Sequence, residues 1–343
     1  MAVTTLVTGA TGFVGAAVAR RLLGAGHDVR VLCRASSDRA NLEGLNVEVA
    51  LGDMTERESL DAALKGCDAL FHVAADYRIW IPNPAEMFKI NVGGTCNVML
   101  AAADAGVSRI VYTSSVATLG IQPNEWANNE ETPVAFEDMI GAYKQSKFLA
   151  EKEVRALAKK GLPIVIVNPS TPVGPGDIKP TPTGRMIVEA AQGKMPVYVD
   201  TGLNIVHVDD VAEGHMLAFE KGEIGERYIL GGDNMSLRDI LIEIAAIVGG
   251  RPPRFSIPHD VIMPIAYVAE AWGHLSGREP FVTVDGLRMA KKKMFFTSDK
   301  AVRKLGYKPR PAHEAIRDAV SWFREKGYLG NGAQKRPSGN RHH

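Results

Sequence analysis

The sequence predicts an α/β protein whose core is a doubly wound parallel sheet, followed by a smaller α/β region. Short apolar runs alternate with helical patterns through the first half of the chain, as in parallel strands joined by right-handed crossovers. Hydrophobicity is continuous within these runs, which suits strands covered on both faces. A glycine-rich turn directly after the first run is the third indication, because such a turn opens the first crossover helix of many of these sheets.

The expected elements follow from this alternation. Strands are predicted at residues 3–8, 28–33, 47–50, 69–72, 109–113 and 164–168, and helices at residues 12–23, 57–65, 84–105 and 142–160. Prolines from Pro169 onward predict irregular loops. The later patterns are a helix at residues 210–220, a strand at 227–230, a helix after Ser236, an apolar helix at 261–272 and an amphipathic helix at 312–326.

Composition and charge exclude several classes of protein. The formal net charge is +1, so the overall charge does not attract the chain to nucleic acid. Cys33, Cys67 and Cys96 are widely spaced and have no histidine pair nearby, so we expect neither a disulfide framework nor a metal site. The first residues show no export signal and no apolar stretch is long enough to span a bilayer, so we expect a cytoplasmic protein.

The turn Gly9-Ala10-Thr11-Gly12-Phe13-Val14-Gly15 predicts a phosphate site at a helix N-terminus. Phosphate binding there requires close approach of the backbone, which Cβ atoms would block. The spacing differs from the commoner Gly-x-Gly-x-x-Gly, but its place between a strand and a helix is the expected one. The alternative is a tight strand–helix turn that binds no ligand.

The ends of the next predicted strands extend this dinucleotide site. The second strand is followed by Arg34 and lacks the acidic residue that would bind a free ribose 2′-hydroxyl, which favours NADP(H), with NAD(H) as the alternative. Asp53, beside Met54, is placed to accept from the adenine amino group. Ala74 and Ala75 are small where the backbone must pass close to the cofactor. For each residue, a surface or packing role is the alternative.

We therefore divide the chain into three parts. A dinucleotide-binding domain of the Rossmann type covers residues 1–170. A substrate-binding region covers residues 171–330, with some segments returning to the sheet. Residues 331–343 form a polar tail that we expect to be flexible.

A second set of residues indicates redox chemistry. Tyr143 and Lys147 are four residues apart on a predicted helix, so their side chains face the same way. A neighbouring ammonium favours the phenolate and lowers the pKa of a tyrosine, which lets it exchange a proton with a substrate hydroxyl. A hydroxyl from Ser114 or Ser115, at the end of the fifth predicted strand, would orient the reacting oxygen.

Together these motifs resemble the extended short-chain dehydrogenase/reductases. The matching stretches are residues 8–15, 52–53, 72–75, 114–115, 143 with 147, and 206–212. The resemblance implies that Ser115, Tyr143 and Lys147 carry catalysis, with Tyr143 and Lys147 also contacting the cofactor. It further implies that Asn91 supports Lys147 and that Pro169 borders the nicotinamide.

A closer likeness extends nearly end to end. Residues 71–80, 177–185 and 289–296 resemble the hopanoid-associated sugar epimerases, bacterial proteins similar to dihydroflavonol 4-reductases. This resemblance implies a small-molecule substrate, chemistry on a sugar-like or polyol carbon, and a role in hopanoid biosynthesis.

Substrate contacts are expected from two segments. The first follows the fourth predicted strand, at the carboxyl edge where substrates sit, and contains Asp76, Tyr77 and Trp80. Core packing is the alternative for the two aromatic residues. The second lies in the irregular second half, where Arg185, Tyr198 and Asn204 are expected to close over the pocket.

The residues leave the reaction open between net reduction and epimerisation through transient oxidation. Epimerases of this superfamily usually retain NAD and reductases commonly consume NADPH, so Arg34 favours the reductase. A sugar-nucleotide dehydratase fits less well, because such enzymes typically carry an Asp-Glu pair where this chain has Ser115-Val116. The alternative from another class is a non-catalytic dinucleotide-binding sensor or scaffold, against which Tyr143 and Lys147 both argue.

The sequence and the resemblance each suggest one further partner. The apolar residues 261–268 and the run Lys291-Lys292-Lys293 suggest contact with a membrane surface, although a buried helix and a solvated charge run are the favoured interpretation. The superfamily resemblance implies a homodimer formed through the helix that carries Tyr143 and Lys147.

Overall fold

A computed structural model describes residues 2–122, 127–278, 280 and 282–330, and the predicted tail at residues 331–343 lies outside them. Within the described residues, seven parallel strands form the central sheet in the order β10-β6-β5-β4-β1-β2-β3. They are β1 (Thr4–Thr8), β2 (Asp28–Cys33), β3 (Glu48–Leu51), β4 (Ala69–His72), β5 (Arg109–Thr113), β6 (Ile164–Pro169) and β10 (Arg227–Leu230). The strand order reverses between β1 and β4, where doubly wound sheets bind ligands. The predicted fold class is confirmed.

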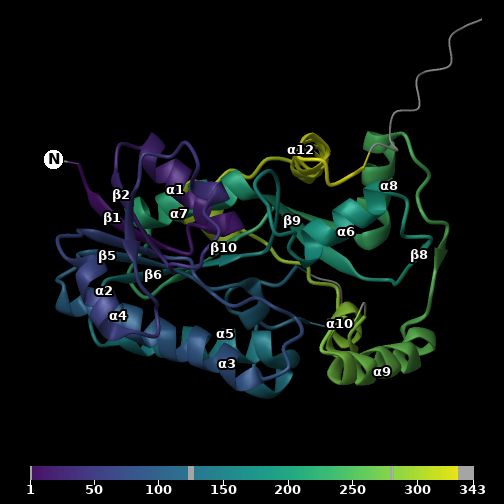
Figure 1. Cartoon of the computed structure of the whole chain (residues 1–343), viewed down its shortest axis with the longest axis horizontal. Helices are drawn as coiled ribbons and strands as arrows, with labels where there is room; N and C mark the ends of the chain where they lie inside the picture. The colour runs from purple at the N-terminus through teal and green to yellow at the C-terminus, as the bar shows by residue number, and fades with distance from the viewer. Residues whose placement is uncertain (1, 123–126, 279, 281, 331–343) are drawn as a thin grey trace, which may run out of the picture.

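Helices cover both faces of this sheet (Figure 1). One layer contains α1 (Phe13–Gly24), α7 (Val208–Lys221) and α11 (Asp299–Leu305), and the other contains α2 (Arg57–Leu64), α4 (Thr95–Asp104) and α5 (Gly141–Lys159). Successive residues of a strand enter opposite cores, so Val111 packs in one cluster and Ile110 in the other, both fully buried. Burial on both sides is the reason that the strands are apolar throughout.

The helix predicted at residues 84–105 is interrupted. It consists of α3 (Pro84–Phe88), a π-helical segment (Lys89–Gly94) and α4. The π-helical segment holds Asn91 buried, and Met54 packs so closely on Gly94 that a Cβ there would lie 2.8 Å from its Cε. Local pattern could not show this interruption, because it depends on contacts with the ends of β3 and β4.

The second half of the chain adds a smaller unit with its own core. A small sheet joins β7 (Thr171–Val173), β9 (Gly202–His207) and β11 (Asp233–Ser236), and β8 (Val197–Tyr198) pairs with β12 (Phe255–Ser256). The helices α6 (Pro182–Ala191), α8 (Leu237–Val248) and α12 (Ala312–Glu325) pack with this sheet around one apolar cluster. Short 3₁₀ turns occur at Ala40–Leu42, Val116–Thr118 and Phe136–Asp138.

Two further helices, α9 (His259–Ser276) and α10 (Val284–Ala290), lie against each other at one end of the molecule (Figure 1). The favoured expectation of a buried helix at residues 261–272 is wrong for the outer side of α9. Val268 is 71% exposed and Trp272 is 67% exposed, whereas Ala266, Ala269 and Gly273 are buried and Ile262 and Met263 pack partly on an apolar cluster shared with α10. Among the described residues, no helix combines the length and apolar composition needed to cross a bilayer.

Candidate active site

Two positions in the glycine turn after β1 must be glycine because of contacts within the protein itself. Gly9 has φ +75°, and a Cβ on it would lie 2.7 Å from the backbone nitrogen of Ala74. A Cβ on Gly15 would lie 2.1 Å from the carbonyl oxygen of Gly9. A tight turn without ligand would therefore explain both of them.

Gly12 is different, because the protein leaves space around it. The nearest atom to a Cβ on Gly12 would be the Gly9 carbonyl oxygen, at 3.3 Å. Gly12 is the N-cap residue of α1, and no side chain caps this end or places an acidic group in the first turn. The N–H groups at such an end attract phosphate, so the turn fits the pyrophosphate of a dinucleotide. Phe13 and Val14, which follow, pack partly on the core.

The ends of β2 and β3 bring Arg34 and Asp53 within electrostatic reach of each other. Asp53 Oδ1 accepts hydrogen bonds from the Thr55 backbone and hydroxyl, both at 2.8 Å. Partial burial by itself would raise the pKa of Asp53, but the Thr55 bonds and the charges of Arg34 and Lys89 lower it overall. Arg34 is exposed, with its cation available to an anionic ligand on this side of the sheet.

A hydroxyl that sequence reasoning missed holds the segment after β4. Thr8 Oγ1 accepts from the backbone N–H groups of Val73 and Ala74, each at 3.2 Å, and contacts His72 Nδ1 at 2.7 Å. Burial lowers the pKa of His72 to about 3, so its ring is neutral and serves as a bridge between Thr8 and Thr95. Ala74 and Ala75, which follow, are partly exposed beside the glycine turn.

Tyr143 and Ser115 meet at the carboxyl end of β5. Ser115 caps the 3₁₀ turn after β5, with its Oγ accepting from the Ala117 backbone at 3.1 Å. Burial raises the pKa of Tyr143, and a hydrogen bond with the Ser115 side chain opposes that effect. The tyrosine is therefore a neutral phenol in the free protein, in contact with the serine that the sequence singled out.

Lys147 lies buried one helical turn after Tyr143 and is oriented by β5. Its Nζ donates to the Thr113 carbonyl at 2.9 Å and to the Tyr112 hydroxyl at 3.2 Å. Burial lowers the pKa of Lys147 to about 8, against the opposing effect of Glu151. Sequence reasoning missed Tyr112, whose only signal was a hydroxyl inside an otherwise apolar strand.

Asn91 supports this helix through a neighbour of Lys147. Its Nδ2 donates to Ser146 Oγ at 3.0 Å and to the Asp76 carbonyl at 2.8 Å, and its Oδ1 accepts from the Asp76 backbone at 2.7 Å. These bonds tie α5 to the segment after β4, and they replace the direct support of Lys147 that the resemblance implies.

A buried carboxylate that sequence reasoning missed anchors the Ser115 turn. Glu151 Oε2 accepts from the hydroxyls of Ser114 and Thr118 and from Asn168, at 2.5, 2.8 and 2.9 Å. Its Oε1 pairs with Arg227 of β10 at 3.1 Å. Ser114 is therefore committed to the protein interior, whereas Ser115 contacts Tyr143.

The expected substrate residues are divided between the site and the second unit. Asp76 pairs with Arg78, Tyr77 is 45% exposed, and the ring centroid of Trp80 lies 5.8 Å from that of His274 on α9. These three residues follow β4, as expected. Pro169 ends β6 and is buried.

The residues expected to close the pocket occupy separate places. Arg185 is exposed on α6, and Tyr198 lies in β8, where its carbonyl accepts from Ile257. Asn204 is buried in β9 and binds Gly232 and Phe296 through its amide. The structure thus places Asn204 in the connection between β9 and its neighbours.

The glycine turn at the switch point, together with Ser115 after β5 and Tyr143 and Lys147 on α5, defines an extended short-chain dehydrogenase/reductase. Residues 5–231 match the family model "NAD dependent epimerase/dehydratase family". The chain belongs to this family.

Similar proteins support the same assignment. The chain is 44% identical over 327 residues to a Synechocystis protein with the provisional name dihydroflavonol 4-reductase, covering 94% of this chain and 95% of that protein. It is 38% identical over 328 residues to sterol demethylase protein B of Methylococcus capsulatus. The match covers 95% of this chain and 100% of that protein. The crystal structure of gox2253 superposes with a TM-score of 0.87 at 55% identity, covering 95% of this chain and 99% of that one.

Proposed function

We propose that the protein transfers hydride between a nicotinamide dinucleotide, preferentially NADP(H), and a carbonyl or carbinol carbon of a small molecule. The observation that supports this most directly is the placement of the Tyr143 phenol beside the Ser115 side chain, on the helix that also carries the buried amine of Lys147. The glycine turn ends β1 and the serine follows β5, with β4 alone between these strands. A cofactor bound at the turn therefore extends toward the hydroxyl pair.

In the reductive direction, the neutral phenol of Tyr143 donates its proton to the substrate oxygen. The dinucleotide supplies the hydride. Ser115 donates a hydrogen bond to the same oxygen and fixes its position. The Lys147 ammonium, one helical turn away on α5, stabilises the phenolate that forms.

The preference for NADP(H) rests on Arg34. Its exposed guanidinium at the end of β2 is the group that would meet a ribose 2′-phosphate, and β2 ends in Cys33 in place of a carboxylate. NAD(H) is the alternative cofactor, and the description of the matched family names NAD.

For the substrate, we infer a sugar-like or polyol carbon in hopanoid biosynthesis, from the likeness to hopanoid-associated sugar epimerases. Net reduction is our leading reaction, and the names of the relatives include a reductase and a sterol demethylase protein. Epimerisation is the second candidate, favoured by the name of the matched family.

The test begins with the nucleotide that the purified full-length protein releases on denaturation. Release of NADP, or of no nucleotide, supports the reductase, whereas retained NAD supports the epimerase. NADPH and NADH oxidation is then measured with a panel of ketone and aldehyde substrates that includes keto sugars. A protein that holds no nucleotide and oxidises neither cofactor with any substrate would refute the proposal and favour the non-catalytic alternative.

A further inference from the structure

The outer side of α9 is an apolar stripe without a covering element in the described structure. Its members recur at alternating spacings of four and three residues, which places them on one side of a helix. They are Val261, Ile265, Val268, Trp272 and Leu275, between 50% and 83% exposed. We call these five residues the α9 stripe. A stripe of this kind on a folded protein marks a contact surface.

The inner side of α9 explains how the stripe stays outward. Ala266, Ala269 and Gly273 are the buried residues of the helix, and a Cβ on Gly273 would lie 2.8 Å from Pro280. The small inner residues bring α9 close to its neighbour α10. Ile262 and Met263 pack partly on the apolar cluster shared with α10, so the inner side of the helix is occupied and the stripe lies on the opposite side.

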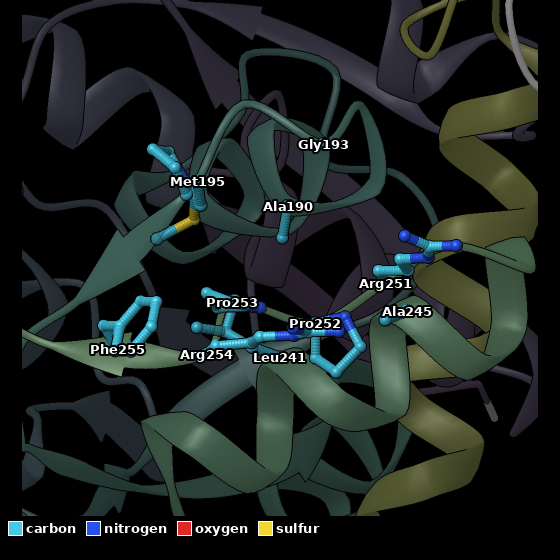
Figure 2. Close-up of a pocket in the computed structure, with 11 residues that line it drawn as sticks. Ala190, Gly193, Met195, Leu241, Ala245, Arg251, Pro252, Pro253, Arg254 and Phe255 are labelled. Carbon is cyan, nitrogen blue, oxygen red and sulfur yellow. The ribbon is translucent and has the colours of Figure 1, made fainter.

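An arginine cluster lies on α8 and on the segment that leads from α8 to α9; Figure 1 shows the two helices apart, with this segment running between them. Arg238, Arg251 and Arg254 surround a hollow of about 440 Å³. All three are exposed, and among the described residues no carboxylate pairs with any of them. Figure 2 shows the 251–255 segment beside α8, with Arg251 near one end and Phe255, 71% exposed, at the other.

The part of the chain that contains α9 and α10 has an excess of positive charge. Residues 250–294 contain seven arginines and lysines against four aspartates and glutamates, although the whole chain has a net charge of +1. The nearby carboxylates are engaged by the protein: Asp260 binds Lys291 at 2.8 Å, and Glu270 accepts from the Val284 backbone at 2.7 Å. Arg251 and Arg254 therefore add positive charge that no described carboxylate neutralises.

We propose that this end of the protein binds an anionic membrane surface, with α9 lying in the plane of the interface. The α9 stripe and Phe255 enter the boundary between headgroups and acyl chains, and Arg238, Arg251 and Arg254 contact anionic headgroups. Apolar side chains combined with unpaired cations are what interfacial helices use to bind such surfaces. A second copy of the chain is the alternative cover of the stripe; the exposed arginines complement the charge of anionic headgroups, which favours the membrane.

The proposal is independent of the proposed reaction, because it concerns binding alone. The full-length protein is floated with vesicles of phosphatidylcholine, and with vesicles that also contain phosphatidylglycerol, at low and moderate salt. We expect binding to the anionic vesicles that weakens with salt, and little binding to the neutral ones.

Two double variants separate the contribution of the apolar side chains from that of the arginines. Val268→Glu with Trp272→Glu should lower vesicle affinity about tenfold or more at any salt, and Arg251→Gln with Arg254→Gln should lower it about tenfold at low salt only. The matched controls are Ile224→Glu, another exposed apolar residue, and Lys159→Gln with Lys160→Gln, exposed cations at the end of α5. Unchanged thermal unfolding midpoints establish that the variants are folded.

Three results would overturn the proposal. The first is absence of binding to both kinds of vesicle at low salt. The second is an equal loss of binding in the control variants. The third is a dimer in sedimentation that Val268→Glu with Trp272→Glu dissociates, since the stripe would then be covered by a second copy of the chain.

Discussion

The central sheet and the α9 end of the molecule use apolar residues in opposite ways. In the sheet, strands such as β5 and β6 are buried on both faces, and their apolar side chains fill two cores. In α9, Ala266, Ala269 and Gly273 are buried and Ile262 and Met263 are partly buried, whereas the residues of the α9 stripe face outward. The comparison shows that apolar content predicts burial only where elements cover both sides of a segment, so the exposed stripe indicates a binding surface.

The largest expected effect concerns the site that the sheet carries. Tyr143→Phe removes the proton donor and keeps the ring, so turnover should fall about 10²–10⁴-fold while dinucleotide affinity changes little. Steady-state kinetics and fluorescence titration of the cofactor measure the two quantities. Tyr267→Phe, an exposed tyrosine on α9, is the matched control. Turnover that persists in Tyr143→Phe would remove this residue from the mechanism.

The difference in burial itself can be tested by truncating one aromatic residue in each region. Phe71→Ala empties a fully buried position in β4 and should lower the free energy of unfolding by about 3–5 kcal/mol. Trp272→Ala, on the exposed side of α9, should change it by less than about 0.5 kcal/mol. Chemical denaturation followed by circular dichroism measures the free energy of unfolding of both variants. Equal losses would mean that Trp272 is buried in solution.

A smaller effect is expected at Arg34. Its replacement by alanine removes a cation that faces the adenosine side, so NADPH affinity should weaken about tenfold, while NADH affinity stays nearly constant. Dissociation constants for both cofactors provide the measurement. Arg39→Ala, an exposed arginine in the same loop, is the control. If both cofactors weaken alike, Arg34 does not bind the 2′-phosphate.

A further effect of burial in the site is a dependence of stability on pH. Burial lowers the pKa of Lys147 from its ordinary value of 10.5 to about 8, so the unfolded chain binds more protons than the folded chain between these pH values. The contribution of Lys147 to the free energy of unfolding therefore rises with pH between the two pKa values. Lys147→Met should make this increase of stability with pH smaller. Part of the increase should remain, because burial also lowers the pKa of Lys144 to about 8. Thermal unfolding from pH 7.5 to about 10 tests this; an unchanged slope in Lys147→Met would contradict it.

Local sequence determined most of the sheet and the residue types of the site. Continuous apolar runs between helical patterns predicted all six strands of the first half to within a few residues. The strand–turn–helix context predicted the glycine turn, and the four-residue spacing predicted that Tyr143 and Lys147 share one side of a helix. These are short-range properties, which depend on periodicity and backbone conformation within a few turns.

Only the tertiary structure decided which side chains meet. Tyr112 orients Lys147, Asn91 binds Ser146 and the segment after β4, and Glu151 secures the turn that carries Ser115. Each contact joins different elements, so no local spacing could reveal it.

The same holds for α9. Its sequence determined an apolar helix, but which side is buried depended on where α10 packs. Hydrophobicity is a property of the residue, whereas burial is a property of its neighbours.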